Sequence, residues 1–214
     1  MHHLRLLAIA LLIALAPSTA RAHFVWLERD PADGAVAAWF GEWADNVRET
    51  QDGYLKLIRA PRAFAVDGRE LPVEVRHDRL VVATGSTSGD LRLSNLLYPE
   101  KGTTLVHYQA KLGRAGTTAQ LPLELVPVAP GSDTFTLLLR GQPLADAGVI
   151  LFTSAGWQRT FKTGADGRVT IETPWPGPAV LEVGHMEKIA GEHEGRAYEA
   201  IRHVATLTIA VPAR

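Results

Sequence analysis

The sequence contains no cysteine among its 214 residues. A chain without cysteine forms no disulfide bond and no thiolate metal site, so its core must stabilise it and any metal ligands must be nitrogen or oxygen atoms. Long apolar runs are also scarce. After the first residues, no segment is long enough to cross a bilayer as a helix, so we expect no membrane insertion of the mature chain.

An excess of positive charge is missing as well. The first 22 residues hold two of the 22 Lys and Arg and none of the 23 Asp and Glu, so residues 23–214 carry a formal charge of −3. A nucleic acid or an anionic membrane would select a basic protein, so neither is expected as a partner. The length of residues 23–214 suits one large domain or two small domains.

The first 22 residues have the features of a secretory signal peptide. A weakly basic start precedes an apolar run at 6–16 and a break at 17–19. The tripeptide Ala20-Arg21-Ala22 then has small residues at the two positions that a signal peptidase reads. We expect cleavage after Ala22, or alternatively after Ala20. An exported protein without cysteine fits a periplasmic location best.

Cleavage after Ala22 would make His23 the first residue of the mature protein. Its free α-amine and its ring Nδ1 can then chelate one metal ion, which is the first half of a histidine brace. Cleavage after Ala20 would place His23 third, where an amine, two deprotonated amides and the ring form a square-planar nitrogen set for Cu(II) or Ni(II). A strand that simply begins with histidine is the plainer interpretation of the same residue.

Short apolar runs separated by turn dipeptides predict an all-β fold. Asp-Gly pairs, as at 67–68 and 166–167, suit turns that need a residue with positive φ. The runs at 71–75 and 80–83 predict a hairpin, and 105–112 and 121–128 predict further strands. No segment has a 3.6-residue period long enough to predict a helix.

The stretch at 126–132, rich in proline and glycine, predicts a domain boundary. We expect a signal peptide at 1–22, an N-terminal β-sandwich domain at 23–128 and a C-terminal β-sandwich domain at 129–214, with immunoglobulin-like or transthyretin-like folds. The order of glycine and proline corners after residue 140 resembles the small transthyretin-like or carboxypeptidase-regulatory modules. Such corners set the tight turns of a seven-strand sandwich.

Strand alternation separates the histidines that follow the signal peptide. His203 shares its parity with an apolar face of the last predicted strand. His185 has the same parity in the preceding strand, so pairing of these strands as a long hairpin would bring His185 and His203 together. His107 alternates with apolar and polar residues in the N-terminal half. His77 at a hairpin tip and His193 in an acidic loop are expected in solvent and are not proposed as ligands.

Six segments carry a resemblance to a known family: 22–27, 40–42, 155–158, 163–168, 174–177 and 198–207. Together they resemble a bacterial periplasmic domain family of largely unknown function, grouped with the soluble part of nickel-uptake (NikM-like) components. The resemblance covers nearly all of 23–214 and implies two β-sandwich modules that handle metal through an N-terminal histidine. Nickel-uptake components continue into membrane spans, which this sequence lacks, so a free metal carrier or sensor is expected.

The sequence therefore predicts a periplasmic protein that sequesters or delivers copper, or alternatively nickel. Copper leads because it has the highest affinity for nitrogen ligands among the divalent first-row metals. The expected ligands are the amine and ring of His23 with some combination of His107, His185 and His203. We expect the His23 Nδ1 to lie within ligand reach of at least one of these three rings.

The expected partners are the metal ion and another periplasmic or membrane metal-handling protein. A ligand ring usually donates its second N–H to a carboxylate or a carbonyl. Glu42, Glu182 or Glu187 could accept that hydrogen bond, and Glu42 is also a candidate oxygen ligand. The residues alone do not choose among them.

Two other functions fit the same residues. A copper oxidase or polysaccharide oxygenase also uses an N-terminal histidine brace, and the five tryptophans could stack against sugars, although tryptophans in sandwiches are more often core or corner residues. A structural or adhesive β-sandwich without a ligand is the usual role of the C-terminal module type. No spacing typical of a Ser-His-Asp triad or of paired hydrolytic carboxylates occurs, and metal binding itself requires no catalysis.

Overall fold

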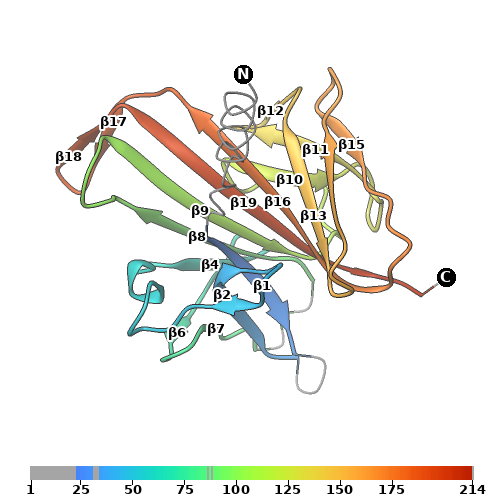
Figure 1. Cartoon of the computed structure of the whole chain (residues 1–214), viewed down its shortest axis with the longest axis horizontal. Helices are drawn as coiled ribbons and strands as arrows, with labels where there is room; N and C mark the ends of the chain where they lie inside the picture. Colours follow the sequence, from blue (N-terminus) through green and yellow to red (C-terminus); the bar gives the residue numbers. More distant parts are fainter. Residues whose placement is uncertain (1–22, 31–33, 86, 88, 214) are drawn as a thin grey trace, which may run out of the picture.

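The structure is a computed structural model that describes residues 23–30, 34–85, 87 and 89–213, and it confirms the expected all-β class (Figure 1). The signal-peptide prediction for residues 1–22 lies outside the described residues. Within the described ranges, no helix has the length and apolar character needed to cross a membrane.

The described part of the chain holds strands β1 to β19 and a 3₁₀ turn, η2. Their bounds are β1 (Phe24–Arg29), β2 (Val36–Glu42), β3 (Val47–Arg48), η2 (Leu55–Leu57), β4 (Arg62–Ala65), β5 (Glu70–Leu71), β6 (Val73–Val75), β7 (Leu80–Val82), β8 (Leu91–Leu97), β9 (Thr104–Leu112), β10 (Leu123–Pro127), β11 (Thr134–Leu139), β12 (Gln142–Pro143), β13 (Gly148–Thr153), β14 (Gln158–Lys162), β15 (Arg168–Thr170), β16 (Gly177–Glu187), β17 (Gly191–His193), β18 (Arg196–Tyr198) and β19 (Ala200–Val211).

An eight-stranded sheet in the order β14-β13-β16-β19-β9-β8-β4-β5, the central sheet, joins the two halves of the chain. The junction is a parallel pair, in which β9 lies beside β19 with Leu105 opposite Ile201. One sheet thus extends across the expected boundary at 128–129. This shared sheet was not expected, because a parallel pair formed by strands so distant in the chain leaves no local signal in the sequence.

Both faces of the central sheet are covered, which gives three layers (Figure 1). The N-terminal sheet, made of β1, β2, β3, β6 and β7, packs on one face, and the C-terminal sheet, made of β10, β11, β12 and β15, packs on the other. Alternate side chains of β19 therefore enter different cores. Val204 belongs to the N-terminal core, whereas Ala205 and Leu207 belong to the C-terminal core.

Strand β1 carries the start of the described chain onto the central sheet. Its first four residues, 24–27, are apolar and at most 3 % exposed. The Thr206 hydroxyl of β19 donates a hydrogen bond of 2.7 Å to the carbonyl oxygen of Val25. Burial of this strand on both faces holds residue 23 in a defined place above β9 and β19.

Candidate metal centre

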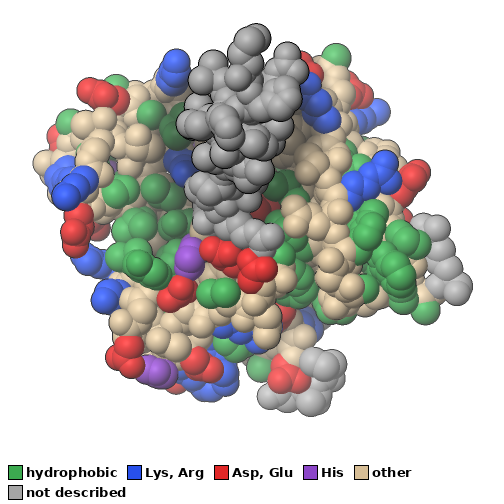
Figure 2. All heavy atoms as spheres, viewed as in Figure 1, with side chains coloured by type: hydrophobic (Ala, Val, Ile, Leu, Met, Phe, Trp, Pro, Cys, Tyr) green, Lys and Arg blue, Asp and Glu red, His purple; other side chains and the backbone are tan. Residues whose placement is uncertain are grey.

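His23 lies next to the acidic end of β2. Antiparallel pairing of Phe24 with Gly41 places residue 23 beside Glu42. Strand β3 returns along β2, and the N–H of Glu49 donates to the carbonyl oxygen of Phe40 at 2.8 Å, which brings Glu49 to the same corner. Figure 2 shows acidic side chains gathered at the surface around the start of β1.

Gly41 allows β3 to approach β2 this closely. Its φ of +151° lies in the region that favours glycine, and a Cβ at this position would collide with the carbonyl oxygen of Val47. A larger residue would push β3 away and carry Glu49 with it. The sequence Phe40-Gly41-Glu42 therefore positions both carboxylates around His23.

Each ring nitrogen of His23 faces one of these carboxylates. Nε2 lies 2.6 Å from Oε1 of Glu49, a hydrogen bond in which the ring N–H donates to the carboxylate. With Nε2 as the donor to Glu49, Nδ1 is the ring nitrogen left to bind a metal once it carries no proton. Nδ1 lies 3.5 Å from Oε1 of Glu42. It is also the nitrogen that can chelate a metal together with the α-amine of the same residue.

Nδ1 and the Glu42 oxygen, 3.5 Å apart, are close enough to become two ligands of one ion. Nitrogen and oxygen ligands lie about 2.0 to 2.2 Å from a metal, so two of them are about 3.4 Å apart at a tetrahedral angle and about 2.9 Å apart at a right angle. A closing movement of about half an ångström would therefore bring this pair to neighbouring positions of a tetragonal ion.

Glu49 is held in its ionised form. Burial alone would raise the pKa of its carboxyl, but a hydrogen bond from the Tyr54 N–H and the one from His23 outweigh burial and lower the pKa below its ordinary value of 4.5. The rings of Phe40 and Tyr54 pack at 5.4 and 5.6 Å from the His23 ring. The imidazole is thus fixed by two rings and one carboxylate.

A groove of about 400 Å³ opens beside this ring, and we call it the His23 groove. Tyr54, Tyr108 and Arg202 contribute its polar groups, and its remaining wall is apolar. The His23 side chain is 26 % exposed. An ion or a small ligand can therefore reach the ring from solvent.

The other three predicted ligands, His107, His185 and His203, form a row across the central sheet, the histidine row. Strand register places His185 of β16 opposite His203 of β19, which confirms the predicted long hairpin. The parallel pair places His203 opposite His107 of β9. The ring centroids of His107 and His203 are 5.7 Å apart.

The histidine row lies on the face of the central sheet opposite His23. Tyr108 and Val204, which follow His107 and His203 directly along their strands, line the His23 groove. Successive side chains of a strand point to opposite faces, so the histidines point into the C-terminal side. The prediction that one of these rings lies within reach of His23 is therefore wrong. Across the described residues, no three His, Asp or Glu side chains are grouped so that they could hold an ion.

His203 is engaged in a chain of hydrogen bonds. The Leu123 N–H donates to Oε1 of Gln109 at 2.9 Å, so the Gln109 amide nitrogen donates to Nδ1 of His203 at 3.1 Å. The Nε2–H of His203 then donates to Glu187 at 2.9 Å. Arg140 donates to both oxygens of that carboxylate at 2.7 and 3.0 Å. Both nitrogens of the His203 ring are used in this way.

Burial favours the uncharged form of two members of the histidine row, His107 and His203. It lowers the pKa of His107 to about 4, with smaller contributions from the charges of His203 and Arg140. Burial also lowers the pKa of His203. The Nε2 of His107 lies at hydrogen-bond distance, 2.7 Å, from the Ser94 hydroxyl. Neutral, partnered rings at the edge of a core are typical of a structural role.

A buried ion cluster was missed in the sequence. Arg92 donates to Glu124 at 3.0 and 2.7 Å, and Lys111 lies 3.2 Å from Glu124 and 3.7 Å from Asp90. All four residues are at most 2 % exposed, and their two positive and two negative charges balance. Lys111 has the parity of Leu105 on β9, so a charge on a buried face was the available signal.

Glu182 of β16 is a partly buried acid whose charge depends on pH. Burial raises the pKa of its carboxyl to about 7, against a lowering effect of Arg202. An unfolded carboxyl ionises near 4.5, so the folded state keeps a proton that the unfolded state loses, and stability falls as the pH rises from 4.5 to 7.

We expect Glu182→Gln to raise the free energy of unfolding by about 1 to 3 kcal/mol at pH 8 and to change it little at pH 4.5. Urea unfolding at the two pH values measures the difference. An equal effect at both values would show that the carboxyl of Glu182 ionises in the folded protein as it does in the unfolded chain.

Of the predicted ligands, His23 alone lies at the surface with carboxylates on both sides. Glu42, expected either as a hydrogen-bond acceptor for a ligand ring or as an oxygen ligand, is the potential ligand nearest to Nδ1 of His23, and Glu49 was not foreseen. Pairing of β1 with a strand that ends in Gly-Glu could have placed Glu42 beside His23. No sequence pattern indicates that β3 returns along β2 and brings Glu49 to the same place. A comparison of the chain with protein-family models gave no match, and no curated protein matches it.

Proposed function

We propose that the protein binds copper, or alternatively nickel, at the start of its mature chain and sequesters or delivers the ion in the periplasm. The ligands would be the α-amine and Nδ1 of His23 and a carboxylate oxygen of Glu42. Two nitrogens and one oxygen suit the tetragonal coordination of Cu(II) and Ni(II). The observation that carries the proposal is the orientation of the His23 ring, whose Nε2 bonds to Glu49 while its Nδ1 faces Glu42.

The electrostatics of the corner support a cation. Two carboxylates flank an imidazole in a part-buried place, where charges interact more strongly than in bulk water. A carboxylate on the second ring nitrogen fixes the tautomer and raises the basicity of the ligating nitrogen. The α-amine appears only when the bond between Ala22 and His23 is cut, so metal binding at this site would begin after export.

One side of the site is open to solvent, which favours exchange of the ion. Sequestration or delivery of the ion requires no chemical reaction. The His23 groove leaves the ring accessible from one side. Another periplasmic or membrane metal-handling protein could therefore approach the ion. The resemblance to nickel-uptake components that the sequence segments suggest would fit such a role, and nickel is the alternative ion for that reason.

The experiment is to isolate the exported protein without an N-terminal tag, because a tag would block the amine. We expect N-terminal sequencing to give His23 as the first residue and metal analysis to give about one copper ion per chain after growth with copper. A start at Arg21 would move the site to the amine, two amides and the His23 ring. A correctly processed protein that retains neither copper nor nickel after desalting would contradict the proposal.

A further inference from the structure

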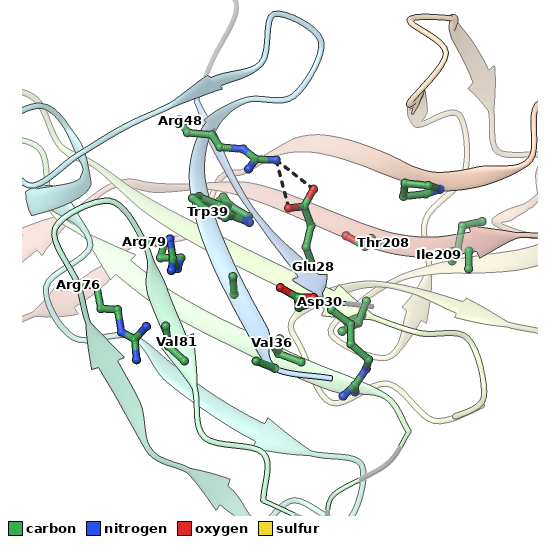
Figure 3. A pocket seen from close by; sticks show the side chains of 16 residues that line it. Glu28, Asp30, Val36, Trp39, Arg48, Arg76, Arg79, Val81, Thr208 and Ile209 are labelled. Atoms are coloured by element: carbon green, nitrogen blue, oxygen red, sulfur yellow. Dashed lines mark hydrogen bonds and ion pairs between the residues drawn. The ribbon is translucent and has the colours of Figure 1, made fainter. Parts of the chain in front are cut away.

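Two adjoining pockets, which we call the tryptophan groove, lie away from the His23 site. The larger pocket, about 690 Å³, lies between the N-terminal sheet and the end of β19 (Figure 3). The smaller pocket, about 350 Å³, lies between the turn after β2 and the turn between β13 and β14. Arg48 and Pro178 line both pockets, so the two are neighbours.

Four of the five tryptophans line this groove. Trp39 lies in the larger pocket, and Trp26, Trp43 and Trp157 lie in the smaller one. Trp26 is 1 % exposed and belongs to the core, but Trp43 and Trp157 are partly exposed. Trp26 and Trp43 form a T-shaped pair at 5.9 Å between ring centroids, and Trp43 and Trp157 each pack against a core. Two partly exposed indole rings therefore line one small pocket.

Arginine side chains stiffen the middle of the groove. The Arg48 guanidinium lies 4.1 Å from the ring centroid of Trp39 and 6.0 Å from that of Trp26, and Glu28 holds it at 3.2 Å. Figure 3 shows Arg48 and Arg79 on opposite sides of Trp39. Stacking of guanidinium groups on indole rings fixes both, so the groove is preformed.

The polar groups of the groove have balanced charges. Arg48 pairs with Glu28, and two of the other three arginines that line the larger pocket also pair with neighbouring acids: Arg76 with Glu74 at 3.1 Å and Arg79 with Asp78 at 2.6 Å. The fourth, Arg29, donates to the carbonyl oxygen of Gly34 at 2.9 Å. Asn46, Ser154 and Gln158 add uncharged donors and acceptors around the smaller pocket. A polyanion would find three of the four arginines already paired with acids, whereas hydroxyl groups can use both members of each pair.

We propose that the tryptophan groove binds an uncharged oligosaccharide. Sugar rings offer apolar C–H faces to indoles and hydroxyl groups to amides, guanidinium groups and carboxylates, which is the mixture found here. Two neighbouring pockets favour a chain of sugars, which can place a ring in each, over a single sugar. The groove shares no lining residue with the His23 groove, so sugar binding would be independent of the metal.

The test is calorimetric titration of the processed, metal-free full mature chain with cellohexaose, chitohexaose and maltohexaose. We expect at least one of them to bind with a Kd of about 10 to 500 μM and to shift the tryptophan fluorescence. Trp43→Ala and Trp157→Ala should each weaken binding about tenfold. Gln158→Ala, at an exposed position outside the core, should weaken it several-fold without affecting the fold.

Trp175→Ala is the matched control, because Trp175 is 44 % exposed and lines neither pocket. This variant and His23→Ala should bind the sugar as the unaltered protein does. Binding of none of the three sugars would overturn the proposal, as would unchanged affinity in Trp43→Ala, Trp157→Ala and Gln158→Ala. Binding of a decaproline peptide in place of the sugars would assign the groove to a protein partner and overturn it too.

Discussion

Replacement of Glu124 by glutamine is expected to lower the free energy of unfolding by about 3 to 5 kcal/mol. The carboxylate accepts two hydrogen bonds from Arg92 and lies 3.2 Å from the Lys111 ammonium. Its other oxygen accepts the N–H groups of Gln120 and Leu121 at 2.7 and 2.8 Å. Glutamine keeps the shape but leaves two buried cations facing a single remaining acid, Asp90.

Urea unfolding at pH 7 measures this effect. Glu74→Gln provides the matched control, because Glu74 makes a similar two-bond pair with Arg76 on the exposed surface, and its loss should leave the unfolding midpoint unchanged. Unchanged stability in Glu124→Gln would mean that water reaches the cluster and solvates the cations that the substitution leaves unpaired.

Replacement of His23 by alanine is expected to weaken copper binding by the processed protein more than about a hundredfold, because the chelate loses its ring nitrogen. The fold should survive, since His23 is partly exposed at the start of a strand and belongs to neither core. Competition titration with a coloured copper chelator measures the affinity, and circular dichroism checks the fold.

Replacement of the two carboxylates separates their roles. Glu42→Gln removes a proposed ligand. Glu49→Gln removes the group that orients the ring, which should weaken metal binding by about 10- to 100-fold. His77→Ala and His193→Ala should bind copper as the unaltered protein does. Equal affinity in His23→Ala and the unaltered protein would place the copper site elsewhere in the chain.

Local patterns in the sequence predicted what depends on neighbours in the chain. Alternation of side chains predicted that His203 lies on an apolar face, and the expected long hairpin predicted that its strand pairs with that of His185. Both features occur in the central sheet. The two cores also follow the two halves of the sequence closely, although residues such as Phe152 and Val204 cross over. That residues 23–128 and 129–214 form two separate domains remains a prediction.

What the sequence did not reveal depends on contacts between distant segments. The parallel pairing of β9 with β19 decides which face each histidine occupies, and it joins strands whose residues, such as His107 and His203, are about a hundred positions apart. The sheet then separates His23 from the histidine row. Glu49 reaches His23 only because Gly41 lets β3 lie close to β2, a contact that no periodicity reports.

The most direct test of the metal site is a copper titration of two proteins that differ only at the N-terminus. One begins at His23, and the other has a five-residue glycine-serine extension before it, which converts the His23 amine into an amide, moves the new amine away from the ring and leaves the ring, Glu42 and Glu49 in place. We expect the extended protein to bind copper at least about a hundredfold more weakly, and the processed protein to release protons on binding. Equal affinity in the two proteins would contradict the chelate and return His23 to the role of a strand-end residue.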